Sequence, residues 1–96
     1  MVRKCDLAKV KQVLLEGLKG FVPEVRIERI PKTDYLHIFV VSDAFENYSF
    51  MQRHNLVGGV LEKALTGNPI YPLITTVSPR TKAEFLEDFG GIPAED

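Results

Sequence analysis

The chain has 96 residues, the size of one small domain, and 45% of them are hydrophobic, as in ordinary globular proteins. Twelve basic and thirteen acidic residues leave a formal charge of −1, which argues against a chain that coats nucleic acid non-specifically.

Cys5 is the single cysteine, which excludes an internal disulfide and a thiolate zinc site; we interpret it as a small buried or half-buried thiol. We expect one domain over residues 1–96, with an acidic tail at about 90–96 that frays.

An amphipathic helix is the first predicted element. Asp6 suits its first turn, and Gly20 and Pro23 predict its end. Its apolar residues recur at helical spacing, and they are Leu7, Val10, Leu14, Leu18 and Phe21. The sequence therefore predicts a helix with one face turned to a core.

A β-hairpin is predicted next. Residues 24–30 alternate, with Val25 and Ile27 on one face, as in a half-buried strand. The turn at 31–34 leads into residues 35–42, a β-branched and aromatic run that is typical of a central strand. His37 lies within this run, and we interpret it as a surface or cross-strand residue rather than a ligand.

Residues 49–65 predict a second helix, with Ser49 as its capping residue. The apolar stripe of this helix comprises Leu56, Val57, Val60, Leu61, Ala64 and Leu65. One turn earlier the stripe reaches Arg53, with His54 at its border. In a packing interpretation, Arg53 pairs with Asp43 or Glu46, and His54 is partly buried and bonds a backbone carbonyl. In a binding interpretation, the guanidinium of Arg53 reaches solvent or a partner.

Two adjacent glycines, Gly58 and Gly59, lie inside this second helix. Each costs roughly 1 kcal/mol relative to alanine in a helix interior. We expect that close backbone approach to a strand, a neighbouring helix or a partner explains them.

A third strand is predicted at residues 70–77, with Pro72 indicating a bulge, a strand start or an edge. A last helix follows, with Ser78 as cap and Pro79 at the first helical position. Its apolar side comprises Phe85, Leu86 and Phe89. The order helix, strand, strand, helix, strand, helix predicts a small α/β domain, in which a three-stranded mixed sheet has helices packed on one face.

The stretch FVVSDAFENYSFMQRHNLVGGVL, residues 39–61, resembles the signature of the BolA family. The matching positions are Val41, Ser42, Asp43, Phe45, Arg53, His54 and Leu61. The similarity extends to residues 21–30 and 70–79, so that it covers about 60 of the 96 residues. The resemblance implies a class II KH-like fold, and it implies a [2Fe–2S] cluster shared with a monothiol glutaredoxin.

The sequence departs from the family pattern at several positions. Asn47 stands where the family favours Gly, and Asn55 replaces a second Arg. Phe85 lies two residues beyond the family's expected Trp. Tyr71, in the predicted third strand, stands where the family places the His that is implied as an iron ligand. The cluster role therefore does not carry over directly, and we expect no bound metal or cofactor.

The sequence suggests three functions. The first is a non-enzymatic partner-binding module, in which the resemblance suggests an adaptor in redox or iron-related regulation. Its predicted partner-binding residues are Arg53, His54, Asn55 and Tyr71.

The second is a KH-like nucleic-acid-binding domain of the transcriptional-regulator type. Its predicted contacts are Lys32, Arg53, Lys63, Arg80 and Lys82, although the GXXG loop of KH modules is absent from the sequence.

The third function, an enzyme, has only His54 and Asp43 as an acid–base pair, and the sequence offers no nucleophile with a partner and no cofactor loop. The N-terminal residues do not resemble a signal peptide, and no stretch has the length of a membrane span. We expect a cytoplasmic protein without enzymatic activity.

Overall fold

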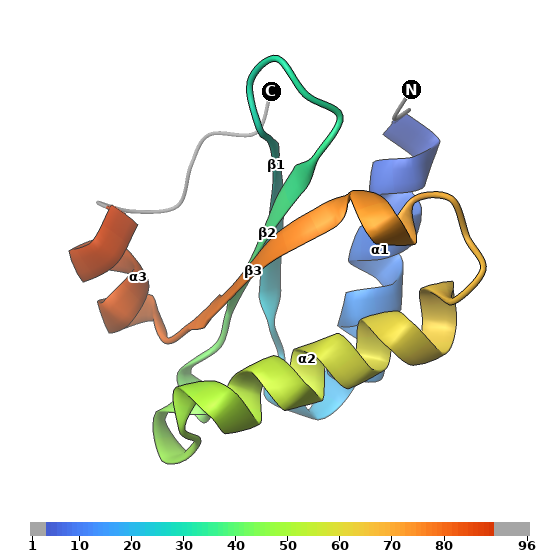
Figure 1. The fold of residues 1–96 in the computed structure, drawn as a ribbon. Coiled ribbons are helices and arrows are strands. Elements are labelled where there is room, and N and C mark those ends of the chain that lie inside the picture. The colour runs from blue at the N-terminus through green and yellow to red at the C-terminus, as the bar shows by residue number, and fades with distance from the viewer. Residues whose placement is uncertain (1–3, 90–96) are drawn as a thin grey trace.

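The computed structural model describes residues 4–89, and the tail predicted over about 90–96 lies outside them. Within these residues the helices are α1 (Lys4–Gly17), α2 (Phe50–Leu65) and α3 (Lys82–Phe89). The strands are β1 (Glu24–Arg29), β2 (Leu36–Val41) and β3 (Ile74–Arg80). Short 3-10 turns occur at η1 (Lys19–Phe21), η2 (Asp43–Asn47) and η3 (Tyr71–Leu73). The predicted order of helices and strands is confirmed (Figure 1).

The sheet is three-stranded and mixed, with the strand order β1-β2-β3. β1 and β2 run antiparallel, so that Arg26 lies opposite Phe39. β2 and β3 run parallel, so that Phe39 also lies opposite Ser78, and the register shifts between Leu36 and His37. The prediction of a central second strand is confirmed.

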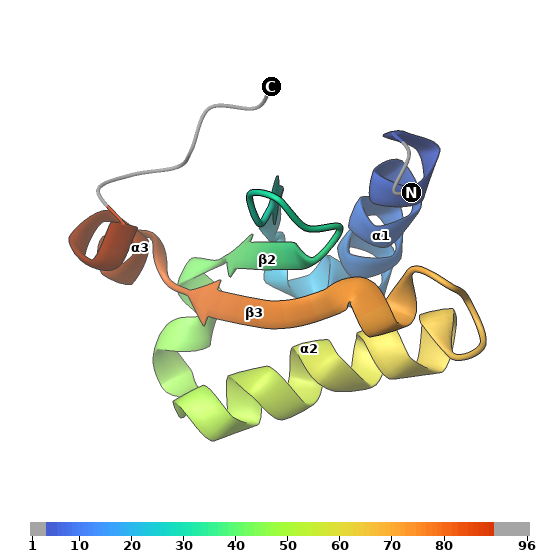
Figure 2. The same cartoon turned by 45° about the horizontal axis from the view of Figure 1, so that its top comes forward.

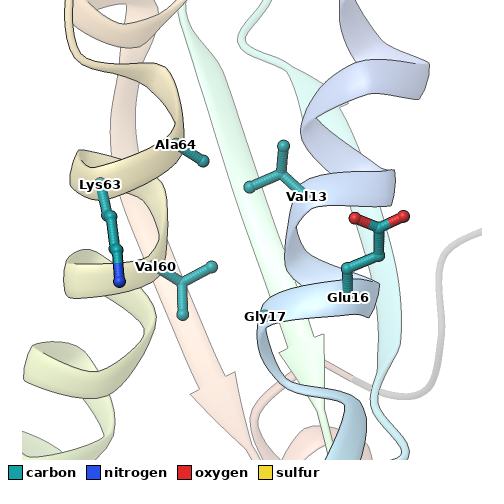
Figure 3. A pocket seen from close by; sticks show the side chains of 6 residues that line it. All are labelled: Val13, Glu16, Gly17, Val60, Lys63 and Ala64. Carbon is teal, nitrogen blue, oxygen red and sulfur yellow. The ribbon is translucent and has the colours of Figure 1, made fainter.

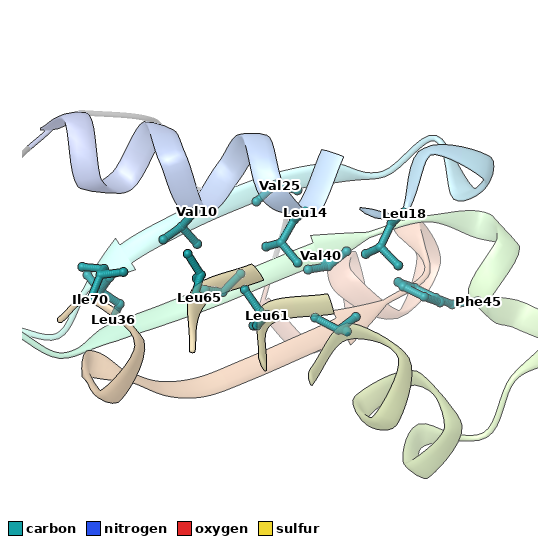
Figure 4. Packing of buried hydrophobic residues seen from close by; sticks show 12 residues of the cluster. Val10, Leu14, Leu18, Val25, Leu36, Val40, Phe45, Leu61, Leu65 and Ile70 are labelled. Atoms are coloured by element: carbon teal, nitrogen blue, oxygen red, sulfur yellow. The ribbon is translucent and has the colours of Figure 1, made fainter. Parts of the chain in front are cut away.

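The main core lies between one face of the sheet and the helices α1 and α2 (Figures 2 and 4). β2 contributes alternate residues, Leu36, Ile38 and Val40, all of which are fully buried. The predicted stripe of α2 is buried at Val57, Leu61 and Leu65 and half-buried at Leu56 and Val60, whereas Ala64 is exposed. α1 contributes Val10 and Leu14, followed by Leu18 just beyond its end.

A smaller apolar cluster lies on the opposite face of the sheet. The remaining residues of β2, Phe39 and Val41, pack there with Phe85 of α3. The Phe39 and Phe85 ring centroids are 5.5 Å apart, with ring planes at 81°. The predicted placement of helices on one face of the sheet therefore holds for α1 and α2, whereas α3 packs Phe85 against the opposite face. Leu86, predicted on the apolar side of this helix, is exposed.

The boundary between the third strand and the last helix was predicted wrongly. β3 begins at Ile74, not residue 70, and it continues through Ser78 and Pro79, which are buried. Thr81 caps α3 instead: its Oγ1 accepts the Glu84 N–H (3.2 Å), and a Glu84 carboxylate oxygen accepts the Thr81 N–H (2.9 Å). Parallel pairing with Phe39 and Val40 keeps Ser78 and Pro79 in the strand, although their local pattern predicts a helix start.

The expectation that a strand or a neighbouring helix approaches Gly58 and Gly59 closely was also wrong, whereas approach to a partner stays a prediction. A Cβ added at either position would meet no atom within 4 Å. The close approach occurs at Gly17 of α1, where a Cβ would lie 2.4 Å from Cγ1 of Val60. Cys5 is exposed rather than buried or half-buried. Over residues 4–89, no helix combines the length and apolar character needed to cross a membrane.

Candidate functional site

The candidate site is built around the start of α2. Ser49 caps this helix: its Oγ accepts the Gln52 N–H (3.2 Å), and the Gln52 side chain accepts the Ser49 N–H (2.9 Å). This reciprocal capping box fixes the first turn of the helix. Arg53 follows one residue later on the buried side, and it is only 3% exposed.

Arg53 binds two other segments of the chain. Its Nε donates to the carbonyl oxygens of Phe45 and Tyr48, both at 3.0 Å. Its two terminal nitrogens donate to the Glu84 carboxylate at 2.6 and 3.3 Å. The predicted pairing with Asp43 or Glu46 was wrong, as was the expectation that the guanidinium reaches solvent or a partner. Asp43 instead accepts the backbone N–H of Lys82 (3.1 Å).

Glu84 links Arg53 to the start of α3. The Arg53 hydrogen bond is the main cause that holds the pKa of the Glu84 carboxyl below its ordinary value, against a smaller opposing effect of burial. The same carboxylate closes the capping box with Thr81. Arg53 and Glu84 therefore join α2, η2 and α3 into one frame.

Large apolar side chains are exposed on this frame. Phe50 is 52% exposed, Met51 is 74% exposed and Tyr48 is 39% exposed. The Phe50 ring centroid lies 4.8 Å from the Arg53 guanidinium carbon and 5.0 Å from that of Arg80. We call Tyr48, Phe50 and Met51 the α2-start surface. Sequence reasoning missed these residues, although Phe50 and Met51 are apolar residues that lie outside the buried stripe.

His54 lies beside this surface and is exposed. Its Nδ1 is 2.9 Å from the Phe50 carbonyl oxygen, and its Nε2 is 3.0 Å from the Val77 carbonyl oxygen. Carbonyl oxygens only accept, so a neutral ring donates to one of them and only the imidazolium donates to both. His54 thus connects α2 to β3 through backbone oxygens, so the predicted carbonyl contact is confirmed, whereas the predicted partial burial is wrong. Asn55, next along the helix, is exposed.

Tyr71 does not join the Arg53–His54 group. It begins η3 rather than lying in a strand, and it is half-buried against the main core. η3 follows the C-terminal end of α2, whereas His54 lies near the other end. At 1.5 Å per residue, the helix from His54 to Leu65 spans roughly 16 Å. The structure therefore separates the predicted partner-binding residues into two places.

The predicted nucleic-acid contacts are also dispersed. Lys32 lies in the β1–β2 turn in the left-handed region (φ 65°), and Arg53 is buried. Lys63 lines a groove of about 420 Å³ between α1 and α2 (Figure 3). Arg80 lies where β3 leads into α3, with Lys82 two residues further on. Arg80 shares the Phe50 ring with the buried Arg53 and donates to Asp88 at 3.1 Å. The five residues do not form one basic surface.

The donors needed for an iron–sulfur cluster are not brought together in residues 4–89. His37 lies on the sheet face opposite α2, in a 2.7 Å hydrogen bond with the Ser78 hydroxyl and stacked on Phe39 (centroids 4.1 Å apart). Burial is the largest effect on His37 and lowers the pKa of its ring. Within the same residues, no group of three or more His, Cys, Asp and Glu side chains could hold a metal ion. With a phenol at Tyr71, these residues do not fit the cluster.

The fold and this site define a small α/β domain in which a buried arginine joins two helices and the loop between β2 and α2. Solved structures with this fold are BolA and BolA-like proteins. The chain matches BolA1 from Arabidopsis thaliana with a TM-score of 0.59 and 25% identity, over 80% of this chain and 92% of that one. It matches the BolA domain of SufE1 from Arabidopsis thaliana with a TM-score of 0.59 and 22% identity, over 88% and 99% of the two chains.

A BolA-like protein from Rickettsia prowazekii matches with a TM-score of 0.56 and 16% identity, over 84% of this chain and 95% of that one. No protein-family model and no curated protein matches the sequence. The structural matches confirm the predicted resemblance and support the BolA-like family for this chain.

Proposed function

We propose that this domain is a non-enzymatic module that binds a protein partner through the α2-start surface. The observation that carries the proposal is the exposure of Phe50 and Met51, at 52% and 74%, in the first turn of a capped helix. Aromatic and methionine side chains are enriched in the centres of protein interfaces.

The frame beneath this surface supports the proposal. Arg53 holds the η2 carbonyl oxygens and Glu84 while it lies under the Phe50 ring. The exposed side chains are thus presented on a backbone that is already ordered, which lowers the entropic cost of binding. One of the structural matches is a BolA domain of SufE1, so a domain of this fold occurs as part of another protein.

The partner class that the family resemblance implies is a monothiol glutaredoxin. We propose an association without a shared cluster, because Tyr71 stands where the resemblance implies a histidine ligand. The role is that of an adaptor in redox or iron-related regulation.

The proposal is tested by measuring the affinity for an apo monothiol glutaredoxin by calorimetry. Met51→Ser changes an exposed residue and is expected to weaken binding roughly tenfold, as is usual for a residue at the centre of an interface. Leu86→Ser on α3 is the matched control, because Leu86 is also a large exposed side chain (62%). No binding by the wild type, or equal affinity for both variants, would contradict the proposal.

Nucleic-acid binding is the alternative. Of its predicted residues, Arg53 is buried and paired with Glu84, and Lys32 and Lys63 lie on other elements than Arg80 and Lys82. The placement of the cations therefore supports it less well. A titration with single-stranded DNA at several salt concentrations distinguishes the two functions, because contacts to phosphates produce a steep salt dependence. A steep slope with tight binding would favour the alternative.

A further inference from the structure

β1 is an edge strand of the sheet. Its only neighbour among the described strands is β2, and its six residues pair with β2 without a register shift. The side chains on one face of β1 alternate in charge as Glu24, Arg26 and Glu28. Charged side chains on an edge strand ordinarily discourage pairing with another chain. Because the signs alternate here, the charges can attract the matching edge of a second copy instead of repelling it.

The backbone groups available at this edge follow from the hairpin register. The Ile30 N–H donates to the Tyr35 carbonyl oxygen (2.9 Å), which makes this a hydrogen-bonded pair. Hydrogen-bonded pairs alternate along an antiparallel ladder, so Glu28, Arg26 and Glu24 direct their backbone groups towards β2. The backbone groups of Val25 and Ile27 therefore point away from β2, towards the outer edge.

We propose that β1 pairs with β1 of a second copy of this chain, antiparallel and centred on Ile27. A two-fold axis perpendicular to the sheet would then give one continuous sheet of six strands. Such pairing uses the outward backbone groups of Ile27 in both copies. The surface is separate from the α2-start surface, and the inference does not depend on the proposed function.

The charges select this register among the neighbouring ones. Centred on Ile27, Arg26 of each copy lies opposite Glu28 of the other, which gives two pairs of opposite charge. A shift of the centre to Arg26 would place Arg26 against Arg26 and Glu24 against Glu28. A further shift would place Pro23, which has no N–H, where a backbone donor is needed. Of these three registers, the one centred on Ile27 satisfies both the backbone and the charges.

An exposed leucine on α1 lies beside the β1 edge and supports pairing at this edge. Val13 and Gly17 lie on the flank of α1 that meets α2, and Val13 lines the groove between the two helices. Leu15 follows Val13 by two residues, or 200° around the helix, and thus lies on the opposite flank. α1 packs against β1 and α2 against β3, so this flank faces the outer side of β1. Leu15 is 39% exposed there, and a second copy would cover it.

The net charge of −1 also leaves little repulsion between copies. The edges that meet are short, so the dimer is expected to be reversible and to form with increasing concentration. Its mass is measured by sedimentation equilibrium of the full chain from micromolar to millimolar concentrations.

Charge reversal tests the register. Glu28→Arg places a cation opposite Arg26 in each of the two pairs. Because both pairs become repulsive, the dimer dissociation constant is expected to rise roughly tenfold or more. The double variant Arg26→Glu/Glu28→Arg restores opposite charges in the same register and should return the dissociation constant to the wild-type range. Glu62→Arg, an equal charge change at an exposed position of α2, is the matched control.

Hydrogen exchange on the wild type provides a test that needs no variant. The Ile27 amide points outwards and should gain protection as the concentration rises, whereas the Glu28 amide, paired with β2, should be protected throughout. A wild type that remains monomeric at millimolar concentration would overturn the proposal. So would a Glu28→Arg dimer as tight as that of Glu62→Arg, or an Ile27 amide whose exchange is independent of concentration.

Discussion

The residues of the BolA-like signature act mainly as structural contacts in this chain. Ser42 is 3% exposed, and its hydroxyl donates to the Phe21 carbonyl oxygen (2.6 Å). Phe45 is fully buried, and Arg53 donates to its carbonyl oxygen. The adjacent Arg53 and His54 therefore have different tasks: the arginine joins buried segments, and the histidine binds backbone oxygens at the surface.

The Arg53–Glu84 contact predicts a dependence of stability on pH. Because the pKa of Glu84 is lowered in the folded state, the unfolded state takes up a proton first as the pH falls. The contribution is complete above the ordinary pKa of 4.5 and is lost as the pH falls through the folded value. Glu84→Gln should therefore flatten the decline in the urea midpoint between about pH 5 and about pH 3.

Glu87→Gln is the matched control, because Glu87 is an exposed carboxylate of the same helix. The lowered pKa of His37 also makes stability fall on acidification, but that decline starts near the ordinary histidine value of 6.5 and is common to all the variants. Identical acid profiles for Glu84→Gln and Glu87→Gln would show that the Arg53–Glu84 contact does not contribute.

At the scale of the elements, one glycine of the helices is needed for close packing and two others are not. Gly17 allows α1 to approach Val60 of α2, whereas a Cβ added at Gly58 or Gly59 would meet nothing beyond their own helix within 4 Å. The same residue type is thus required for packing at one position and not at the other two. Helix propensity and steric contact predict opposite results for alanine at these positions.

We predict that Gly58→Ala and Gly59→Ala each raise the free energy of unfolding by about 0.5–1 kcal/mol, because alanine is the better helix former. Gly17→Ala should lower it by about 1–3 kcal/mol, because the new methyl group overlaps the Val60 side chain. Urea unfolding measures all three. Val60→Ala in the Gly17→Ala background should recover part of the loss, and stabilisation by Gly17→Ala alone would contradict the packing of α1 on α2.

The elements with strong periodicity were predictable from the sequence, and the contacts between distant residues were not. The stripe of α2 and the capping role of Ser49 follow from local spacing, and both are confirmed, except that Ala64 of the stripe is exposed. The start of α3 was missed because parallel pairing keeps Ser78 and Pro79 in β3. The partner of Arg53 was missed because Glu84 lies 31 residues away along the chain, beyond the reach of any local pattern.

At the scale of the whole molecule, the chain shares its fold with BolA and BolA-like proteins. TM-scores of 0.56–0.59 accompany identities of only 16–25%, so the same architecture is built from largely different residues. The position that the resemblance assigns to an iron ligand holds Tyr71, which is half-buried against the main core. A side chain that packs there can preserve the fold without supplying a histidine.

We predict that the wild-type protein, mixed with a cluster-loaded monothiol glutaredoxin, does not show the visible absorption and circular dichroism of a histidine-ligated [2Fe–2S] cluster. His is the familiar non-thiolate protein ligand of such clusters, and a phenol is not its ordinary substitute. His37 is bonded to Ser78, and both ring nitrogens of His54 lie against carbonyl oxygens, so neither replaces the missing donor without breaking these contacts. Tyr71→His should introduce the histidine-type spectrum, and Tyr71→Phe is the matched control that should not. A histidine-type spectrum from the wild type would refute the prediction, whereas association of the apo proteins, measured separately, addresses the α2-start surface alone.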